Sequence, residues 1–133
     1  MNLEERIAKA RELKVQPTHN CCQAVVEVLK DQTEIPREVL QQAASGFAAG
    51  IGNMEGTCGA LVGAVMVAGL KLKTNKTVSE TVKISEEFET LCGATACKDL
   101  KGKDGAPGVC SCVDCVENAV RAYEKILGIE ERK

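Results

Sequence analysis

The chemistry of this chain should come from sulfur, because its 133 residues include eight Cys but only one His. With a single His, the chain has few residues from which to build a Cys-His-Asp active site, and too few for a His-rich metal site. Residues 1–6 are charged and lack the apolar run of a signal peptide, so we expect a cytoplasmic protein. Structural disulfides are rare in that reducing compartment, and eight Cys there favour metal, cluster or redox roles.

Several cysteines fall where helices are predicted to begin. Asn20 and Thr57 have the side chains of N-caps, and each is followed directly by a Cys. A helix N-terminus carries partial positive charge and free N–H groups, which lower the pKa of a thiol and stabilise the thiolate. If these starts meet at one end of the protein, they form a site for anionic sulfur. Its predicted members are Cys21, Cys58, Cys112 and Cys115, with Cys97 as a further ligand.

The local cysteine spacing excludes several common sites. Residues 112–115 read Cys-Val-Asp-Cys, but there is no second CxxC, so the zinc-ribbon pattern fails. Val116 follows where a c-type haem motif requires His, which argues against haem. A thioredoxin-like motif needs a βαβ context, and none is predicted. A free Cys can also serve as a small buried hydrophobe, and we expect this of Cys22.

Apolar residues at helical spacing predict helices and no strand. Capping boxes at Asn2-x-x-Glu5 and Thr77-x-x-Glu80 should open the first and fifth helices. The fourth helix is apolar all round and should be central and buried. We therefore expect an all-α fold, a compact irregular bundle of about five to six helices in one domain over residues 1–133. The predicted helices span 2–16, ended by Pro17, then 20–30, 36–47, 58–72, 77–91 and 112–127, with loops over 50–56 and 101–109.

Charge and composition exclude several classes of binding partner. Lys plus Arg is 17 and Asp plus Glu is 19, a net charge of −2, which argues against a nucleic-acid binder. Aromatic residues make up 2% of the chain, so platforms for stacking bases are nearly absent and no nucleotide cofactor is expected. The longest apolar run, residues 58–70, is shorter than the roughly 20 residues of a membrane span. The expected partner is a redox protein or a small redox molecule, and a homodimer is left open.

Four blocks of the sequence resemble a bacterial and archaeal family of small redox-active proteins, named for its pattern of Cys, Gly-Cys-Ala-x-x-Gly, Cys and Cys. The second block reads Cys-Gly-Ala-x-x-Gly here, with Cys58 before Gly59. The resemblance implies that the functional cysteines are Cys21, Cys58, Cys97 and Cys115, with Cys22, Cys92, Cys110 and Cys112 as extra ones. The four blocks are Asn-Cys-Cys-Gln-Ala-Val at 20–25, Cys-Gly-Ala-Leu-Val-Gly at 58–63, Cys-Lys-Asp-Leu at 97–100, and Cys-Val-Glu-Asn-Ala-Val at 115–120.

The family is also similar to the helical part of split-Soret cytochromes, which carries an iron–sulfur centre bound by cysteines. The leading hypothesis is therefore an iron–sulfur or related metal-cluster protein that transfers electrons, because four thiolates suffice for such a cluster. The GxxxG pair Gly59 and Gly63 leaves a bare helix face for the cluster or for a packed helix. One alternative is a dithiol–disulfide oxidoreductase, in which Cys58 attacks and Cys21, Cys97 or Cys115 resolves. Another is a zinc-stabilised interaction module.

Overall fold

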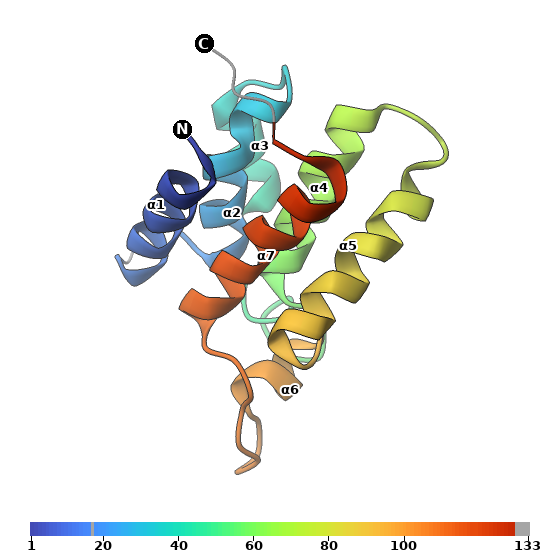
Figure 1. Cartoon of the computed structure of the whole chain (residues 1–133). Helices are drawn as coiled ribbons and strands as arrows, with labels where there is room; N and C mark the ends of the chain where they lie inside the picture. The colour runs from blue at the N-terminus through green and yellow to red at the C-terminus, as the bar shows by residue number, and fades with distance from the viewer. Residues whose placement is uncertain (17, 130–133) are drawn as a thin grey trace.

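The computed structural model describes residues 1–16 and 18–129, and they form an all-α bundle, as predicted (Figure 1). The described chain contains no β-strand, only an isolated bridge between Thr57 and Ala96. Pro17, expected to end the first helix, lies outside the described residues. The helices are α1 (Leu3–Val15), α2 (Cys21–Leu29), a 3-10 turn η1 (Lys30–Gln32), α3 (Arg37–Ala44), α4 (Gly59–Leu72), α5 (Thr77–Cys92), α6 (Cys97–Lys101) and α7 (Cys112–Leu127).

Two predicted helix starts are capped as expected. The Asn2 side chain accepts from the Glu5 amide, and the Glu5 carboxylate accepts from the Asn2 amide. Asn20 forms the same reciprocal pair with Gln23, which fixes the residue after it, Cys21, as the first residue of α2. These caps satisfy amides that a helix start otherwise leaves unpaired.

Two predicted caps are wrong, although the helices themselves form. Cys58, not Thr57, is the N-cap of α4, because hydrogen bonds from Cys58 to Thr95 and from Cys97 to Gly56 hold residue 57 in the bridge, outside the helix. Thr77 opens no capping box, because its hydroxyl donates to the carbonyl of Thr74. The short helix α6 was not predicted.

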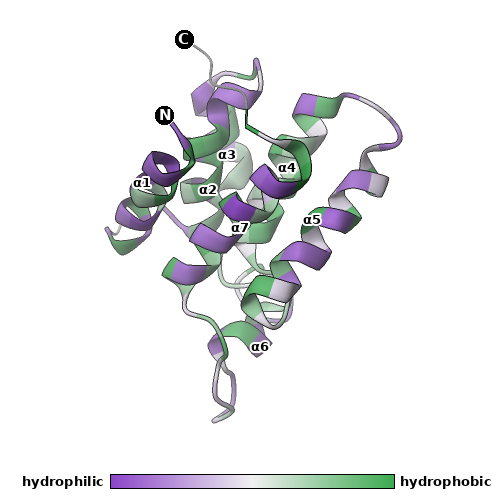
Figure 2. Ribbon diagram, viewed as in Figure 1, coloured by the Kyte–Doolittle hydropathy of each residue, from purple (hydrophilic) through white to green (hydrophobic). Residues whose placement is uncertain are grey.

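The central position of α4 is confirmed. It packs against α2, α5 and α7, and α7 crosses in front of it in Figure 1. Figure 2 shows α4 largely in the colours of apolar residues, whereas α5 and α7 carry polar residues on their outer sides. The buried part of α4 consists mostly of small residues, which lets its neighbours approach closely: Gly59, Ala60, Leu61, Gly63, Ala64, Val67 and Ala68.

The glycines at the start of α4 are required by its contact with α2 and the segment before α4. A Cβ atom at Gly59 would lie 1.9 Å from the Phe47 carbonyl oxygen and 2.6 Å from Cys21 Sγ. At Gly63 it would lie 3.0 Å from the Cys22 carbonyl oxygen. Backbone atoms cannot yield as a flexible side chain does, so the absence of a side chain here sets how closely the two helix starts meet.

We predict that Gly59→Ala destabilises the protein by at least about 2 kcal/mol, because overpacking against backbone forces α4 away from its neighbours. Urea unfolding followed by circular dichroism measures this. Gly69→Ala is the matched control, since a Cβ there meets only Thr77 Cγ2, at 3.9 Å. Because Gly69 lies within α4, Gly69→Ala should be neutral or should stabilise the protein by up to about 1 kcal/mol. Equal stability of the two variants would contradict the close contact.

An ion pair with a buried arginine joins α1 to the turn η1 that follows α2. Arg6 is 2% exposed, and its guanidinium donates to both carboxylate oxygens of Asp31, at 2.6 and 2.7 Å. It also donates to the Val28 carbonyl at 2.6 Å. Burial raises the pKa of Asp31, but the hydrogen bonds from Arg6 and Gln32 outweigh it and hold that pKa below its usual value. A carboxylate with a lowered folded pKa stabilises the protein above its unfolded pKa.

We predict that Asp31→Asn lowers the free energy of unfolding at neutral pH by about 2 kcal/mol, because it leaves a buried guanidinium without its counterion. The difference from wild type should shrink below about pH 4, as Asp31 becomes protonated in the wild-type protein too. Urea titrations at several pH values measure both effects. Asp104→Asn, on an exposed loop, is the control and should cost little at any pH. A pH-independent difference would contradict the role given to the charge.

Candidate functional site

Four thiols from four helix starts line one pocket of about 230 Å³. Three of them belong to the first residues of α2, α6 and α7, and the fourth belongs to the N-cap of α4. The rest of the lining is largely apolar and includes Ala48, Ala49 and Met54. The expected meeting of helix starts therefore takes place. The four cysteines are Cys21, Cys58, Cys97 and Cys112.

Backbone hydrogen bonds fix two of these cysteines beside each other. The amide of Cys58 donates to the Thr95 carbonyl at 2.8 Å, and the amide of Cys97 donates to the Gly56 carbonyl at 3.0 Å. These bonds join the loop before α4 to the segment that leads into α6. Hydrogen bonds between segments that are distant in the sequence thus fix where the short helix α6 begins.

The loop before α4 has strained backbone beside the pocket. Ala49, Ile51 and Met54 have positive φ angles of 50°, 63° and 67°, a region that residues with side chains seldom adopt. Ala49 and Met54 line the pocket. Strain of this kind persists only where surrounding contacts enforce it, and it is concentrated at functional sites.

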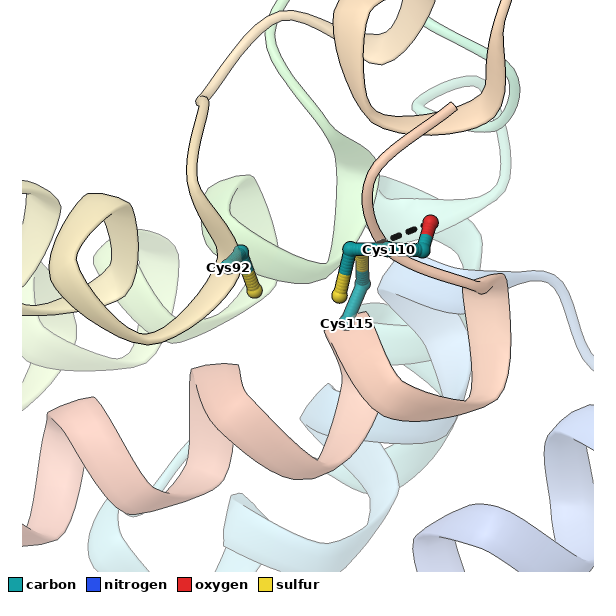
Figure 3. Close-up of side chains that lie close together, drawn as sticks. All are labelled: Cys92, Cys110 and Cys115. Atoms are coloured by element: carbon teal, nitrogen blue, oxygen red, sulfur yellow. Dashed lines mark hydrogen bonds between the residues drawn. The ribbon is translucent and has the colours of Figure 1, made fainter. Parts of the chain in front are cut away.

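A second group of thiols lies next to the pocket, at the junction of α5, the loop before α7, and α7 itself (Figure 3). The sulfur atoms of Cys92, Cys110 and Cys115 lie within 4.8 Å of one another. The Asn118 amide donates to Cys92 Sγ at 3.2 Å. Within the described residues, no other set of three thiol, imidazole or carboxylate groups is this compact.

Lys101 lies between the two groups. Its side chain lines the pocket, and its ammonium nitrogen lies 3.0 Å from Cys115 Sγ. Burial lowers the pKa of Lys101, but its contacts with the thiols of Cys115 and Cys58 together raise that pKa by more, so the net shift is upward. A cation is therefore held among the sulfur atoms.

The thiols differ from expectation in their pKa values. Contact with the Cys115 thiol, together with burial, raises the pKa of Cys58 to about 11. Burial raises the pKa of Cys22 to about 12 and also raises that of Cys97. Contact with the Cys58 thiol raises the pKa of Cys21. Desolvation and crowding with other thiols thus outweigh the helix N-termini at Cys21 and Cys58, and the predicted lowering of the thiol pKa is wrong for these two residues.

The structure brings together three of the four cysteines that the sequence singled out, namely Cys21, Cys58 and Cys97. Cys115 lies outside the pocket lining, although its thiol contacts that of Cys58. Cys22 is fully buried, with its sulfur 3.9 Å from Met66 Sδ, in the packing role expected of it.

Gly59 lines the pocket beside Cys21, and Gly63 packs against α2. Lys101 and Asn118 were missed by the sequence reasoning. Their positions carried a signal, since Lys101 is four residues after Cys97 and Asn118 three after Cys115, on the same helix faces.

Residues 19–126 of the chain match the family described as "Putative redox-active protein (C_GCAxxG_C_C)". The matched span includes all eight cysteines. Neither the comparison with curated proteins nor that with solved structures found a match. None of the described helices combines the length and apolar character needed to cross a bilayer.

We predict that alkylation of the native metal-free protein labels Cys110 and Cys112 first. These two cysteines are partly exposed, whereas the other six are at most 7% exposed. A reagent reaches a buried thiol only after local opening, so the six should react on the timescale of unfolding. Peptide mass spectrometry over a time course measures the order, with urea-unfolded protein as the control in which all eight react together. Early labelling of Cys58 would contradict the described packing.

Proposed function

Because the chain belongs to the redox-active family defined by this cysteine pattern, we propose that it is a cysteine-based redox protein whose pocket holds an iron–sulfur cluster. The observation that carries the proposal is the set of four thiols, from four helix starts, around one mostly apolar pocket. Such a cluster supplies reversible one-electron transfer, and four cysteine thiolates are its usual ligands. The proposed ligands are Cys21, Cys58, Cys97 and Cys112.

The spacing and volume of the pocket suit a cluster better than a single ion. No three of the four pocket thiols lie within 4.8 Å of one another. One tetrahedral zinc ion would need its sulfurs about 3.8 Å apart, from a Zn–S bond of about 2.3 Å. The pocket volume of about 230 Å³ is several times the roughly 30 Å³ that one water occupies in the liquid. A polynuclear group fits these dimensions.

The surrounding residues have roles that follow from charge and solvent access. Four thiolates carry a large negative charge into an apolar pocket, and the ammonium of Lys101 offsets part of it. Lys14 also lines the pocket. An electron donor or acceptor that docks here, whether a protein or a small redox molecule, therefore meets lysine side chains. The apolar lining limits water at the sulfur atoms, which is one of the factors that set the potential of such a centre.

Dithiol–disulfide exchange is the second candidate, and one contact favours it. The Cys58 thiol interacts with the thiols of both Cys21 and Cys115, so an attacking sulfur and two resolving sulfurs are adjacent. An exchange with a disulfide substrate would start from the Cys58 thiolate, displace the substrate's first thiol, and form a mixed disulfide. Cys21 or Cys115 would then displace the second thiol and leave an internal disulfide.

We predict that protein purified without air contains iron and acid-labile sulfide and shows visible charge-transfer absorption. Cys112→Ser should lose most of the iron and sulfide, because it removes a proposed ligand. Cys115→Ser, the matched control three residues along the same helix, should retain both. Metal analysis and absorption spectra of the three proteins measure this.

Two other results would each overturn part of the proposal. Loss in Cys115→Ser and retention in Cys112→Ser would make Cys115 the fourth ligand, as the family resemblance implies. Iron-free, colourless wild-type protein under these conditions would overturn the cluster. A fall of two in the thiol count on oxidation of that iron-free protein would instead support dithiol chemistry.

A further inference from the structure

The three-thiol group of Cys92, Cys110 and Cys115 shares no member with the four pocket thiols and has no role in the proposed cluster. Each of its sulfurs comes from a different element: the last residue of α5, the loop before α7, and the second half of the first turn of α7 (Figure 3). Their sequence positions are up to 23 residues apart (115 − 92), so the convergence is a product of the fold. The three sulfur atoms lie within 4.8 Å of one another.

The spacing is close to that of a mononuclear thiolate site. A zinc ion with Zn–S bonds of about 2.3 Å holds its sulfurs about 3.8 Å apart. The group therefore needs to contract by at most about 1 Å, the difference between that spacing and the present limit. Cys110 is only partly buried and lies just after an exposed loop, so its side chain can make this adjustment.

Hydrogen-bond donors already face two of the sulfurs. Asn118 Nδ2 donates to Cys92 Sγ at 3.2 Å, and Lys101 Nζ donates to Cys115 Sγ at 3.0 Å. Donors at this position stabilise thiolate and orient it, as outer-shell groups do in metal sites. Three thiolates and a divalent cation have a net charge of −1, which the ammonium of Lys101 balances. A monovalent ion would leave −2, of which the single lysine balances only one charge, so the charge favours a divalent ion.

Of the three cysteines, Cys110 lines an open surface cavity of about 610 Å³, whose lining also includes Asn118, Asp114 and Glu117. Both carboxylates are engaged by arginine: Arg11 donates to Asp114 at 2.9 Å and to Glu117 at 2.8 Å. Among the described residues no fourth ligand joins the group, so the remaining position of a bound ion would be left to the cavity that Cys110 lines. Three protein ligands with an open position are typical of zinc sites that bind water or an exogenous ligand.

We propose that Cys92, Cys110 and Cys115 form a second metal site, which binds Zn²⁺ through three thiolates and leaves its fourth position to water or a small ligand from the cavity. Binding displaces one proton from each thiol, and these protons go to solvent. No electron is transferred in this step. The site shares no ligand with the pocket cluster, although the contact between Cys58 and Cys115 and the side chain of Lys101 connect the two groups.

The test uses a background in which the pocket cannot compete for metal, the full-length double variant Cys21→Ser/Cys112→Ser. Titration with Co²⁺ as a spectroscopic probe should give one equivalent bound, with the visible bands of four-coordinate Co²⁺ and thiolate charge transfer. Zn²⁺ should displace it. Adding Cys110→Ser should weaken binding at least about tenfold and reduce the charge-transfer intensity, because one of three thiolates is lost. Adding Cys97→Ser, a thiol outside the group, should change neither.

Wild-type protein provides a second measurement that does not depend on the double variant folding. Saturating Zn²⁺ should slow alkylation of Cys110 at least about tenfold relative to metal-free protein, because a zinc-bound thiolate is a poor nucleophile. Absence of Co²⁺ binding in the folded double variant, equal weakening by Cys97→Ser, or an unchanged alkylation rate of Cys110 would each overturn the site. Iron and sulfide contents of Cys110→Ser distinguish the two centres. They should match wild type whether or not the zinc site exists, and their loss would instead place Cys110 at the cluster.

Discussion

The close approach of the starts of α2 and α4 is the constraint on which the rest of the site depends. It is possible only because Gly59 has no side chain where the Phe47 carbonyl and Cys21 Sγ lie. Once the two starts meet, the thiols of Cys21 and Cys58 become neighbours. The loop that leads into α4 must then turn sharply through positive φ angles, and its carbonyls bind the amides that start α6. A packing requirement at one glycine therefore positions cysteines on three helices.

Placing this many thiols in a buried region has an electrostatic cost if they ionise, and two arrangements keep that cost low. Metal-free thiols are neutral, which burial tolerates, and the raised pKa values of Cys22 and Cys58 express that preference. Thiolates would require compensating charge, since an isolated buried charge is costly. Lys101 supplies one positive charge between the two sulfur groups, and the metal of the proposed sites would supply the rest. The arrangement is thus compatible with neutral thiols or with metal-bound thiolates, but poorly with free thiolates.

Local sequence signals predicted much of the fold and less of the site. The capping boxes at Asn2 and Asn20 and the bounds of α7 were predictable because neighbouring residues decide them. The helix α6 was not, because its start depends on hydrogen bonds from Cys97 and Lys98 to a loop more than 40 residues earlier. The direction of the thiol pKa shifts depends on burial and on thiols from other helices, which no local motif reveals. The cysteines could be chosen from sequence, but their grouping could not.

The start of α7 shows why that grouping needs the fold. Cys112 and Cys115 form a CxxC, and spacing alone would treat them as a pair. On a helix, three residues correspond to a rotation of about 300° and a rise of about 4.5 Å, so the two side chains lie on one side but at different heights. The four-thiol pocket includes Cys112, whereas Cys115 faces the ends of α5 and of the loop before α7. One helix turn therefore divides its two thiols between neighbouring sulfur groups, with Lys101 and the Cys58–Cys115 contact between them. Because the two groups are in contact there, a change of charge in one group alters the electrostatic energy of the other across a few ångströms of low dielectric.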